Sequence, residues 1–115
     1  MSNILLLDSD NFSRTLYQPE QRRGRVVIVY FSASWCVPCQ NMQPVFEKLA
    51  NYYVAEGAHF ATVNIAQSPT LAPKYGIKSV PTIAIFKDAR LINIIAGEVS
   101  FYDAMKVFKP ILEGN

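Results

Sequence analysis

The chain has 115 residues, of which 50% are hydrophobic and 17% charged, and its net charge is +2. This composition excludes a disordered chain, and the length fits one compact domain over residues 1–115. Arg22, Arg23 and Arg25 form the one tight basic group. Because no basic face or aromatic stacking position accompanies them, nucleic-acid binding is not expected. The longest apolar runs are too short to span a bilayer, so no membrane partner is expected either.

The first half of the chain predicts two strands and two helices. Ile4–Leu7 is typical of a short buried strand, and Asp8, Ser9 and Asp10 are N-cap candidates for a helix over about residues 11–17, which Pro19 would end. Residues 26–32, VVIVYFS, have the continuous apolar pattern of a central strand covered on both faces. A long helix follows, because apolar side chains then recur at helical spacing: Met42, Val45, Phe46, Leu49, Ala50 and Tyr53.

The second half predicts three strands and two helices. Residues 60–65 form a strand, and Ser68 with Pro69 begins a short helix that Gly76 ends. Residues 82–86 and 91–96 are separated by a hairpin-length connection and should pair antiparallel. Ser100 caps a last helix, which Pro110 should bend or end early. The order predicts an α/β fold: a mixed sheet of five strands, half parallel and half antiparallel, flanked by four helices.

The segment FSASWCVPCQ contains both cysteines of the chain, Cys36 and Cys39. Cys36 follows the central strand and lies at the predicted start of the long helix, where free backbone N–H groups and the helix dipole favour a thiolate. Residues three apart in a helical turn have Cα atoms roughly 5 Å apart, within reach of a disulfide. Cys36 would therefore attack a partner's disulfide as the nucleophile, and Cys39 would resolve the mixed disulfide.

Other roles for the two cysteines are weaker interpretations. A disulfide closing so short a loop would add only about 2 kcal/mol of stability and needs an oxidising compartment. A zinc site needs four ligands, and one histidine, His59, does not complete the set within one chain. Pro38 between the cysteines argues against two inert core thiols. Redox exchange is the favoured interpretation, while a metal site shared between chains stays open.

The cellular compartment that we expect is inferred from the amino-terminal residues. It carries no basic segment, and Asp8 and Asp10 come too early for a signal peptide. We therefore expect a cytoplasmic, thiol-reducing setting, in which a cysteine pair is more often catalytic or metal-binding than structural.

The segment FSASWCVPCQNMQP is similar to the active site of thioredoxins, in which tryptophan precedes Cys-Gly-Pro-Cys and a proline, here Pro44, follows. The likeness continues from ILLLDSDNF through APKYGIKSVPT to the last helix. It implies the thioredoxin fold and a thiol-disulfide oxidoreductase that reduces protein disulfides. The implied partners are a thioredoxin reductase and disulfide-containing proteins. No metal or bound cofactor is implied, and NADPH would serve only through the reductase. We expect a monomer.

The resemblance also implies a substrate groove. It assigns a cis peptide bond to Pro81, facing the cysteines, and a backbone at Val80 that binds an extended substrate segment by strand addition. Trp35 and Gly97 would border this groove. Val37 and Pro38, between the cysteines, complete the expected substrate-binding set.

Several positions depart from the usual thioredoxin pattern. Tyr30 and Thr62 stand where the family places a buried aspartate and its lysine partner. Tyrosine titrates near pH 10 and accepts no proton at neutral pH, so the resolving step should be slower and depend on water or backbone contacts. Val37 replaces glycine and Gln40 a common basic residue, and residues 26–46 carry no charge. The Cys36 thiolate would then rely on the helix terminus, beside an apolar contact surface.

Two other functions remain as alternatives. One is a thioredoxin-fold binding module that docks a dedicated partner while its cysteines are idle. The other is an oxidant or isomerase in an oxidising compartment, which the missing export signal and the absence of a histidine between the cysteines disfavour.

Overall fold

The computed structural model describes residues 4–18 and 24–113. The order of strands and helices is the one predicted, with a short 3₁₀ helix, η1, added after the long helix. The elements are β1 Ile4–Leu7, α1 Phe12–Leu16, β2 Val26–Ser32, α2 Val37–Tyr52, η1 Val54–Glu56, β3 His59–Asn64, α3 Leu71–Lys74, β4 Thr82–Lys87, β5 Arg90–Ala96 and α4 Phe101–Leu112.

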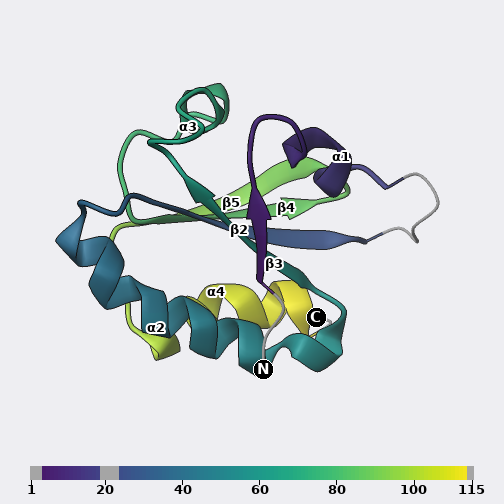
Figure 1. Cartoon of the computed structure of the whole chain (residues 1–115). Coiled ribbons are helices and arrows are strands. Elements are labelled where there is room, and N and C mark those ends of the chain that lie inside the picture. The colour runs from purple at the N-terminus through teal and green to yellow at the C-terminus, as the bar shows by residue number, and fades with distance from the viewer. Residues whose placement is uncertain (1–3, 19–23, 114–115) are drawn as a thin grey trace.

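The five strands form one mixed sheet in the order β1-β3-β2-β4-β5 (Figure 1). β3 pairs in parallel with both β1 and β2, whereas β4 runs antiparallel to β2 and β5 antiparallel to β4. The predicted fold class, a five-stranded mixed sheet with four helices, is therefore confirmed.

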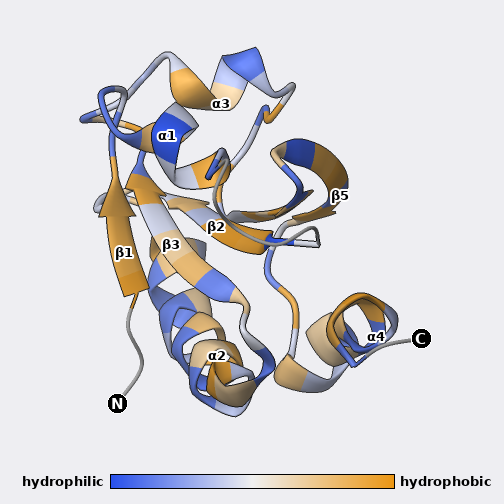
Figure 2. Cartoon of the chain, turned by 90° about the vertical axis from the view of Figure 1, so that its right-hand side faces the viewer, coloured by the Kyte–Doolittle hydropathy of each residue, from blue (hydrophilic) through white to orange (hydrophobic). Residues whose placement is uncertain are grey.

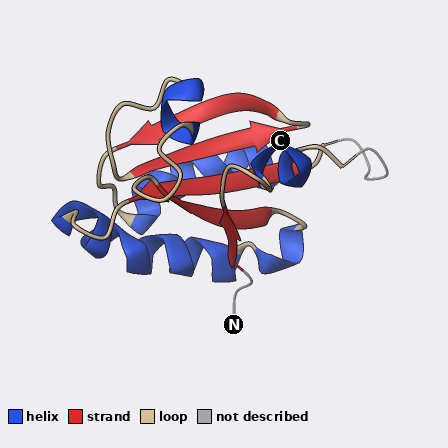
Figure 3. Cartoon of the chain, turned by 45° about the horizontal axis from the view of Figure 1, so that its top comes forward, coloured by secondary structure: helices blue, strands red, loops and turns tan. Residues whose placement is uncertain are grey.

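The helices form two layers, one on each side of the sheet (Figures 2 and 3). α1 and α3 cover one face, and α2 and α4 cover the other. The central strand β2 contributes to both cores, because Ile28 and Tyr30 face α2 and α4 whereas Val27 and Val29 face α1 and α3. Its continuous apolar sequence is explained by this burial on both faces. β2 also leads directly into α2, and the cysteines lie at that junction.

The prediction that Ile4–Leu7 is buried is wrong for most of the strand. Among the described residues β1 pairs with β3 and lies at the edge of the sheet, and Leu5 and Leu6 are exposed while Leu7 enters the core. Leu5 and Leu6 are neighbours and so point to opposite faces, which means that the covering helices leave this edge strand partly open on both faces. A short apolar run carries no sign of this.

Two helix boundaries also differ from the prediction. α3 begins after Thr70, not after Ser68, and Ser68 is buried with its backbone N–H bonded to the Asn64 carbonyl. α4 continues two residues past Pro110 to Leu112. Pro110 removes one backbone donor near the helix end, where the last turn still closes through the bond from the Glu113 N–H to the Lys109 carbonyl.

The predicted ends around the first loop are only partly described. Pro19, Arg22 and Arg23 lie outside the described residues. Arg25 is described, and its guanidinium donates to the Thr15 carbonyl at 2.9 and 3.2 Å, which ties α1 to the start of β2. Within the described parts of the chain, no helix has the length and hydropathy needed to cross a membrane.

Candidate active site

The cysteine segment forms the turn between β2 and α2. Cys36 is the N-cap residue of α2, with an extended backbone, and its N–H bonds to the Ala33 carbonyl at 3.2 Å. Pro38 lies in the first turn of the helix. A backbone N–H there has no partner within the helix, so the missing N–H of proline costs no hydrogen bond. The sequence thus places Cys36 at the helix terminus, as predicted.

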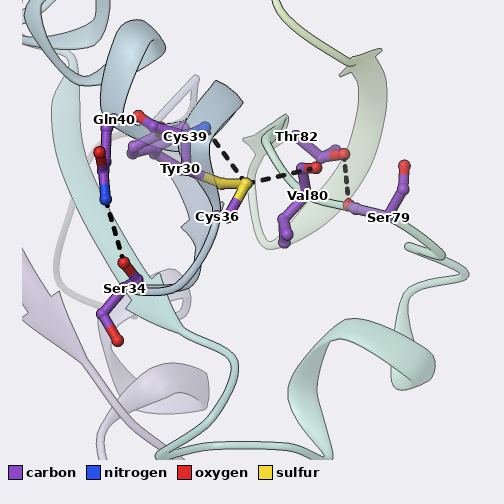
Figure 4. The surroundings of a disulfide bond; sticks show 8 residues. All are labelled: Tyr30, Ser34, Cys36, Cys39, Gln40, Ser79, Val80 and Thr82. Atoms are coloured by element: carbon purple, nitrogen blue, oxygen red, sulfur yellow. Dashed lines mark hydrogen bonds between the residues drawn. A yellow bond between two sulfur atoms is a disulfide. The ribbon is translucent and has the colours of Figure 1, made fainter.

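The Sγ atom of Cys36 acts as the cap of the helix. It accepts a hydrogen bond from the Cys39 N–H at 3.2 Å (Figure 4). The same N–H would be available to a thiolate at Cys36. The positive end of the helix dipole lies at this terminus and also stabilises a thiolate. No charged side chain lies between Val26 and Phe46. Within this segment the helix terminus is therefore the source of positive potential for this sulfur, and Lys78 lines the neighbouring pocket beside Trp35 and Val80.

The two cysteines form a disulfide, so the structure shows the oxidised pair. Their Cα atoms are 5.2 Å apart, close to the separation expected from the helical turn. Cys36 is 6% exposed and Cys39 3% exposed. Cys36 is thus slightly the more exposed of the two, and it is the one at the helix terminus, beside the exposed Trp35 and Val37.

The loop before β4 faces the disulfide. The Val80–Pro81 peptide bond is cis, as the resemblance implied, and the Val80 carbonyl oxygen lies 3.8 Å from Cys36 Sγ (Figure 4). Thr82 Oγ1 donates to the Ser79 carbonyl at 2.8 Å and holds this loop at the strand start. The Gly97 N–H donates to the Pro81 carbonyl at 2.8 Å, so the loop after β5 lies directly beside it.

The surface around Cys36 is apolar. Trp35 and Val37 are 68% and 62% exposed, and Pro38 is also exposed. A pocket of about 520 Å³ lies between Trp35, the Val80 loop and α3. The structure thus brings Trp35 and Val80 together with Cys36, and Pro81 and Gly97 lie in the two adjoining loops.

The inner side of the disulfide is different in character. Tyr30 is fully buried on β2, and its hydroxyl donates to the Cys39 carbonyl at 2.7 Å. Thr62 Oγ1 in turn donates to the Tyr30 carbonyl at 3.2 Å from the neighbouring strand. Burial, with a smaller effect of the Glu98 carboxylate, raises the pKa of Tyr30 to about 12. The Tyr30 hydroxyl thus stays protonated and cannot take the Cys39 proton at neutral pH.

A second, polar pocket adjoins Cys39. It has a volume of about 340 Å³, and we call it the Cys39 pocket; its lining residues are Ser32, Ala33, Ser34, Cys39, Gln40, Gln43 and Asn64. Gln40 Nε2 donates to the Ser34 carbonyl at 3.2 Å across its rim. β2 and β3 are parallel and end at the same edge of the sheet, which places Asn64 beside the cysteine turn.

Sequence comparison identifies this arrangement. The sequence model described as Thioredoxin matches residues 3–108. The chain belongs to the thioredoxin family. It is 38% identical to Thioredoxin 1 of Synechococcus elongatus over 73 aligned residues. The aligned region covers 64% of this chain and 67% of the relative. It is 40% identical to the thioredoxin of Chlorobaculum thiosulfatiphilum over the same shares.

Solved thioredoxin structures have the same fold. The Malassezia sympodialis thioredoxin superposes with a TM-score of 0.81 at 23% identity, over 96% of this chain and 93% of that one. An N21Q mutant thioredoxin from Halobacterium salinarum gives a TM-score of 0.77 at 25% identity, over 96% and 91%. The family match and the Cys36–Cys39 pair show that the chain is a thiol-disulfide oxidoreductase.

Two features of this thioredoxin site were not predicted from the sequence. The first is the contact of the Tyr30 hydroxyl with the Cys39 backbone, since the pattern shows only that an acid is missing. The second is Glu98, an exposed carboxylate near enough to Tyr30 to raise its pKa. The signal in the sequence was the position of Glu98 directly after Gly97, which the resemblance places at the border of the groove. Within residues 4–18 and 24–113, no cluster of three or more His, Cys, Asp or Glu side chains could hold a metal ion.

Proposed function

We propose that the chain reduces disulfides of other proteins, with Cys36 as the nucleophile and Cys39 as the resolving residue. The observation that carries this is the position of Cys36 Sγ at the amino terminus of α2, where the Cys39 N–H donates to it beside an apolar surface. Donated hydrogen bonds and the helix dipole stabilise the thiolate, which is the attacking species.

The exchange has two balanced steps. The Cys36 thiolate attacks one sulfur of the partner's disulfide, forms a mixed disulfide and releases the other partner sulfur as a thiolate, which takes a proton. Cys39 then loses its proton and attacks Cys36 Sγ, which expels the second partner sulfur. Two electrons pass to the partner, and Cys36 and Cys39 end in the bonded state seen in the structure.

The proton of Cys39 leaves by a route that uses no buried acid. Tyr30 keeps its own proton, so the proposed acceptor is water in the Cys39 pocket, beside Ser32 and Asn64. The Tyr30 hydroxyl instead positions the Cys39 backbone. This supports a slower resolving step whose rate follows the Cys39 thiol and the solvent, without an additional ionising group.

Substrate binding is assigned to the groove around Cys36. An extended substrate segment would pair with the Val80 backbone, over Pro81 and between Trp35 and Gly97. Val37 and Pro38 complete its floor on the α2 side. An apolar groove of this kind discriminates little between side chains, which suits several clients.

The proposal extends to the setting of the protein. A thioredoxin reductase would return the pair to the dithiol with NADPH, and we place the protein as a monomer in the reducing cytoplasm. Gel filtration and cell fractionation test these two statements. No observation favours the alternative of a binding module with idle cysteines.

The deciding experiment is reduction of insulin driven by a thioredoxin reductase and NADPH. We expect turnover in the wild-type chain and none above background in Cys36→Ser, because serine supplies no thiolate. The proposal fails if the wild-type chain, fully reduced beforehand with dithiothreitol, does not reduce insulin in a single turnover. That measurement separates a missing reductase partner from a missing activity.

A further inference from the structure

A third concave surface lies between α2 and α4, away from the disulfide. It has a volume of about 610 Å³, and we call it the α2–α4 pocket; its lining residues are Lys48, Tyr52, Phe101, Tyr102, Met105, Lys106 and Lys109. With a helical rise of about 1.5 Å per residue, Lys48 lies roughly 18 Å along α2 from Cys36. The proposed redox function makes no use of this pocket.

The floor of the α2–α4 pocket is a cluster of aromatic rings. Phe101 meets Tyr52 edge to face with ring centroids 5.8 Å apart, and Tyr102 with centroids 5.5 Å apart. Tyr52 is nevertheless 53% exposed and Tyr102 72% exposed. Exposed aromatic side chains held by mutual contact supply apolar area with little entropy left to lose on binding.

The rim of the pocket is cationic. Lys48 Nζ lies 4.4 Å from the Phe101 ring centroid. Lys106 pairs with Asp103 at 3.5 Å and Lys109 with Glu113 at 3.8 Å, both at the surface. Such exposed pairs are weak, so an incoming carboxylate can exchange with them. No carboxylate is among the described residues that line the pocket.

We propose that the α2–α4 pocket binds an acidic peptide segment of a partner protein. One apolar side chain of the segment sits on Tyr102 and Met105, and flanking carboxylates meet the lysines. A concave site between two helices fits a side chain better than a flat anionic bilayer. A second copy of this chain is a poorer occupant, because its net charge is +2. Such a contact holds a partner while the cysteine groove stays free.

The test is an NMR titration of the oxidised full-length chain with a synthetic peptide in which one phenylalanine is flanked by glutamates. We expect amide shifts around Phe101 and Lys48 that weaken as salt is raised. A peptide with glutamines in place of the glutamates should bind at least about fivefold more weakly.

Variants locate the site. Tyr102→Ser should weaken the peptide at least about tenfold and Lys48→Gln about twofold to fivefold. Lys87→Gln, an exposed lysine on β4, is the matched control and should change nothing. Insulin reduction should be unchanged in all three, so its result stands apart from this test.

Several outcomes would overturn the inference. Absence of shifts at the pocket at millimolar peptide would do so, as would equal binding of the glutamine peptide. Shifts at these residues caused by anionic lipid vesicles, with none from the peptide, would assign the surface to a membrane. A dimer in sedimentation that Tyr102→Ser dissociates would assign it to a second copy.

Discussion

The two cysteines are bonded to each other, yet they face different surroundings. Cys36 borders an exposed apolar surface made by Trp35 and Val37, with the Val80 carbonyl opposite. Cys39 faces inward to the hydroxyl of Tyr30 and a polar pocket. The difference indicates that recognition and attack depend on one side and resolution on the other. Substitutions on the two sides should therefore affect separate steps.

The largest effect is expected from Cys39→Ser. This variant keeps the attacking thiol and the apolar surface, so it should still form a mixed disulfide with insulin but not release it. Steady-state turnover should fall to background, while mass spectrometry detects the stable adduct. If the adduct resolves as quickly as in the wild type, the division of roles between the two sides is wrong.

Trp35→Ala should act on the recognition side alone. Removing this exposed aromatic should lower kcat/KM for insulin about tenfold, mostly through KM, because contact area with the substrate is lost. The free energy of unfolding should stay within about 0.5 kcal/mol, since the side chain packs little in the fold. Rapid-mixing kinetics should show slower attack and unchanged resolution. A slowed resolution step would show that the two sides are coupled.

Tyr30→Phe tests the inner side. The Cys39 carbonyl loses its buried hydroxyl donor, and we expect the free energy of unfolding to fall by about 1 kcal/mol in urea titrations. The resolution rate should change less than about threefold, with the same pH profile, because the Tyr30 pKa of about 12 already excludes it as a base. Loss of an ionisation from the profile in Tyr30→Phe would contradict this.

The smallest effect concerns acid stability, and it should arise away from both cysteines. Arg25 Nη1 lies 2.9 Å from His59 Nε2, and burial together with the Arg25 charge lowers the pKa of His59. Below about pH 6.5 the unfolded chain therefore binds a proton that the folded chain does not. The free energy of unfolding should fall as the pH drops from about 7 towards the lowered pKa, and then level off.

Urea titrations between about pH 5 and 7 measure this decline. His59→Gln should reduce it, because glutamine does not titrate, and Tyr30→Phe should leave it unchanged. An equal decline in His59→Gln would place the titrating group elsewhere, with the surroundings of Cys39 as the first place to look.

The strands and the long helices were predictable because their signals are local. The continuous apolar run of β2 and the helical period of α2 each follow from the residues of the element itself. The start of α3 was not predictable in this way, because the Ser68 N–H bonds to the Asn64 carbonyl in the turn after β3 and Ser68 does not cap the helix. The hairpin between β4 and β5 turns over Asp88 and Ala89, both with positive φ, although alanine gives no sign of that conformation.

The site was predictable in its chemistry and less so in its surroundings. The cysteine spacing and the strand before it are enough to place Cys36 at a helix terminus. The partner of the Tyr30 hydroxyl depends on how α2 packs over β2, which no sequence pattern specifies. Glu98 acts through space from a loop far along the chain. Both are tertiary effects between segments distant in sequence.

The edge position of β1 has a consequence for the order of folding. Ile4 pairs with Phe60, a parallel contact across about half the chain, whereas β4 and β5 pair across a tight turn. Non-local parallel pairing closes a long loop before it gains contacts, so β1 should dock after the hairpin has formed. With Leu5 and Leu6 exposed, its amides should also exchange with solvent deuterium sooner than those of β2.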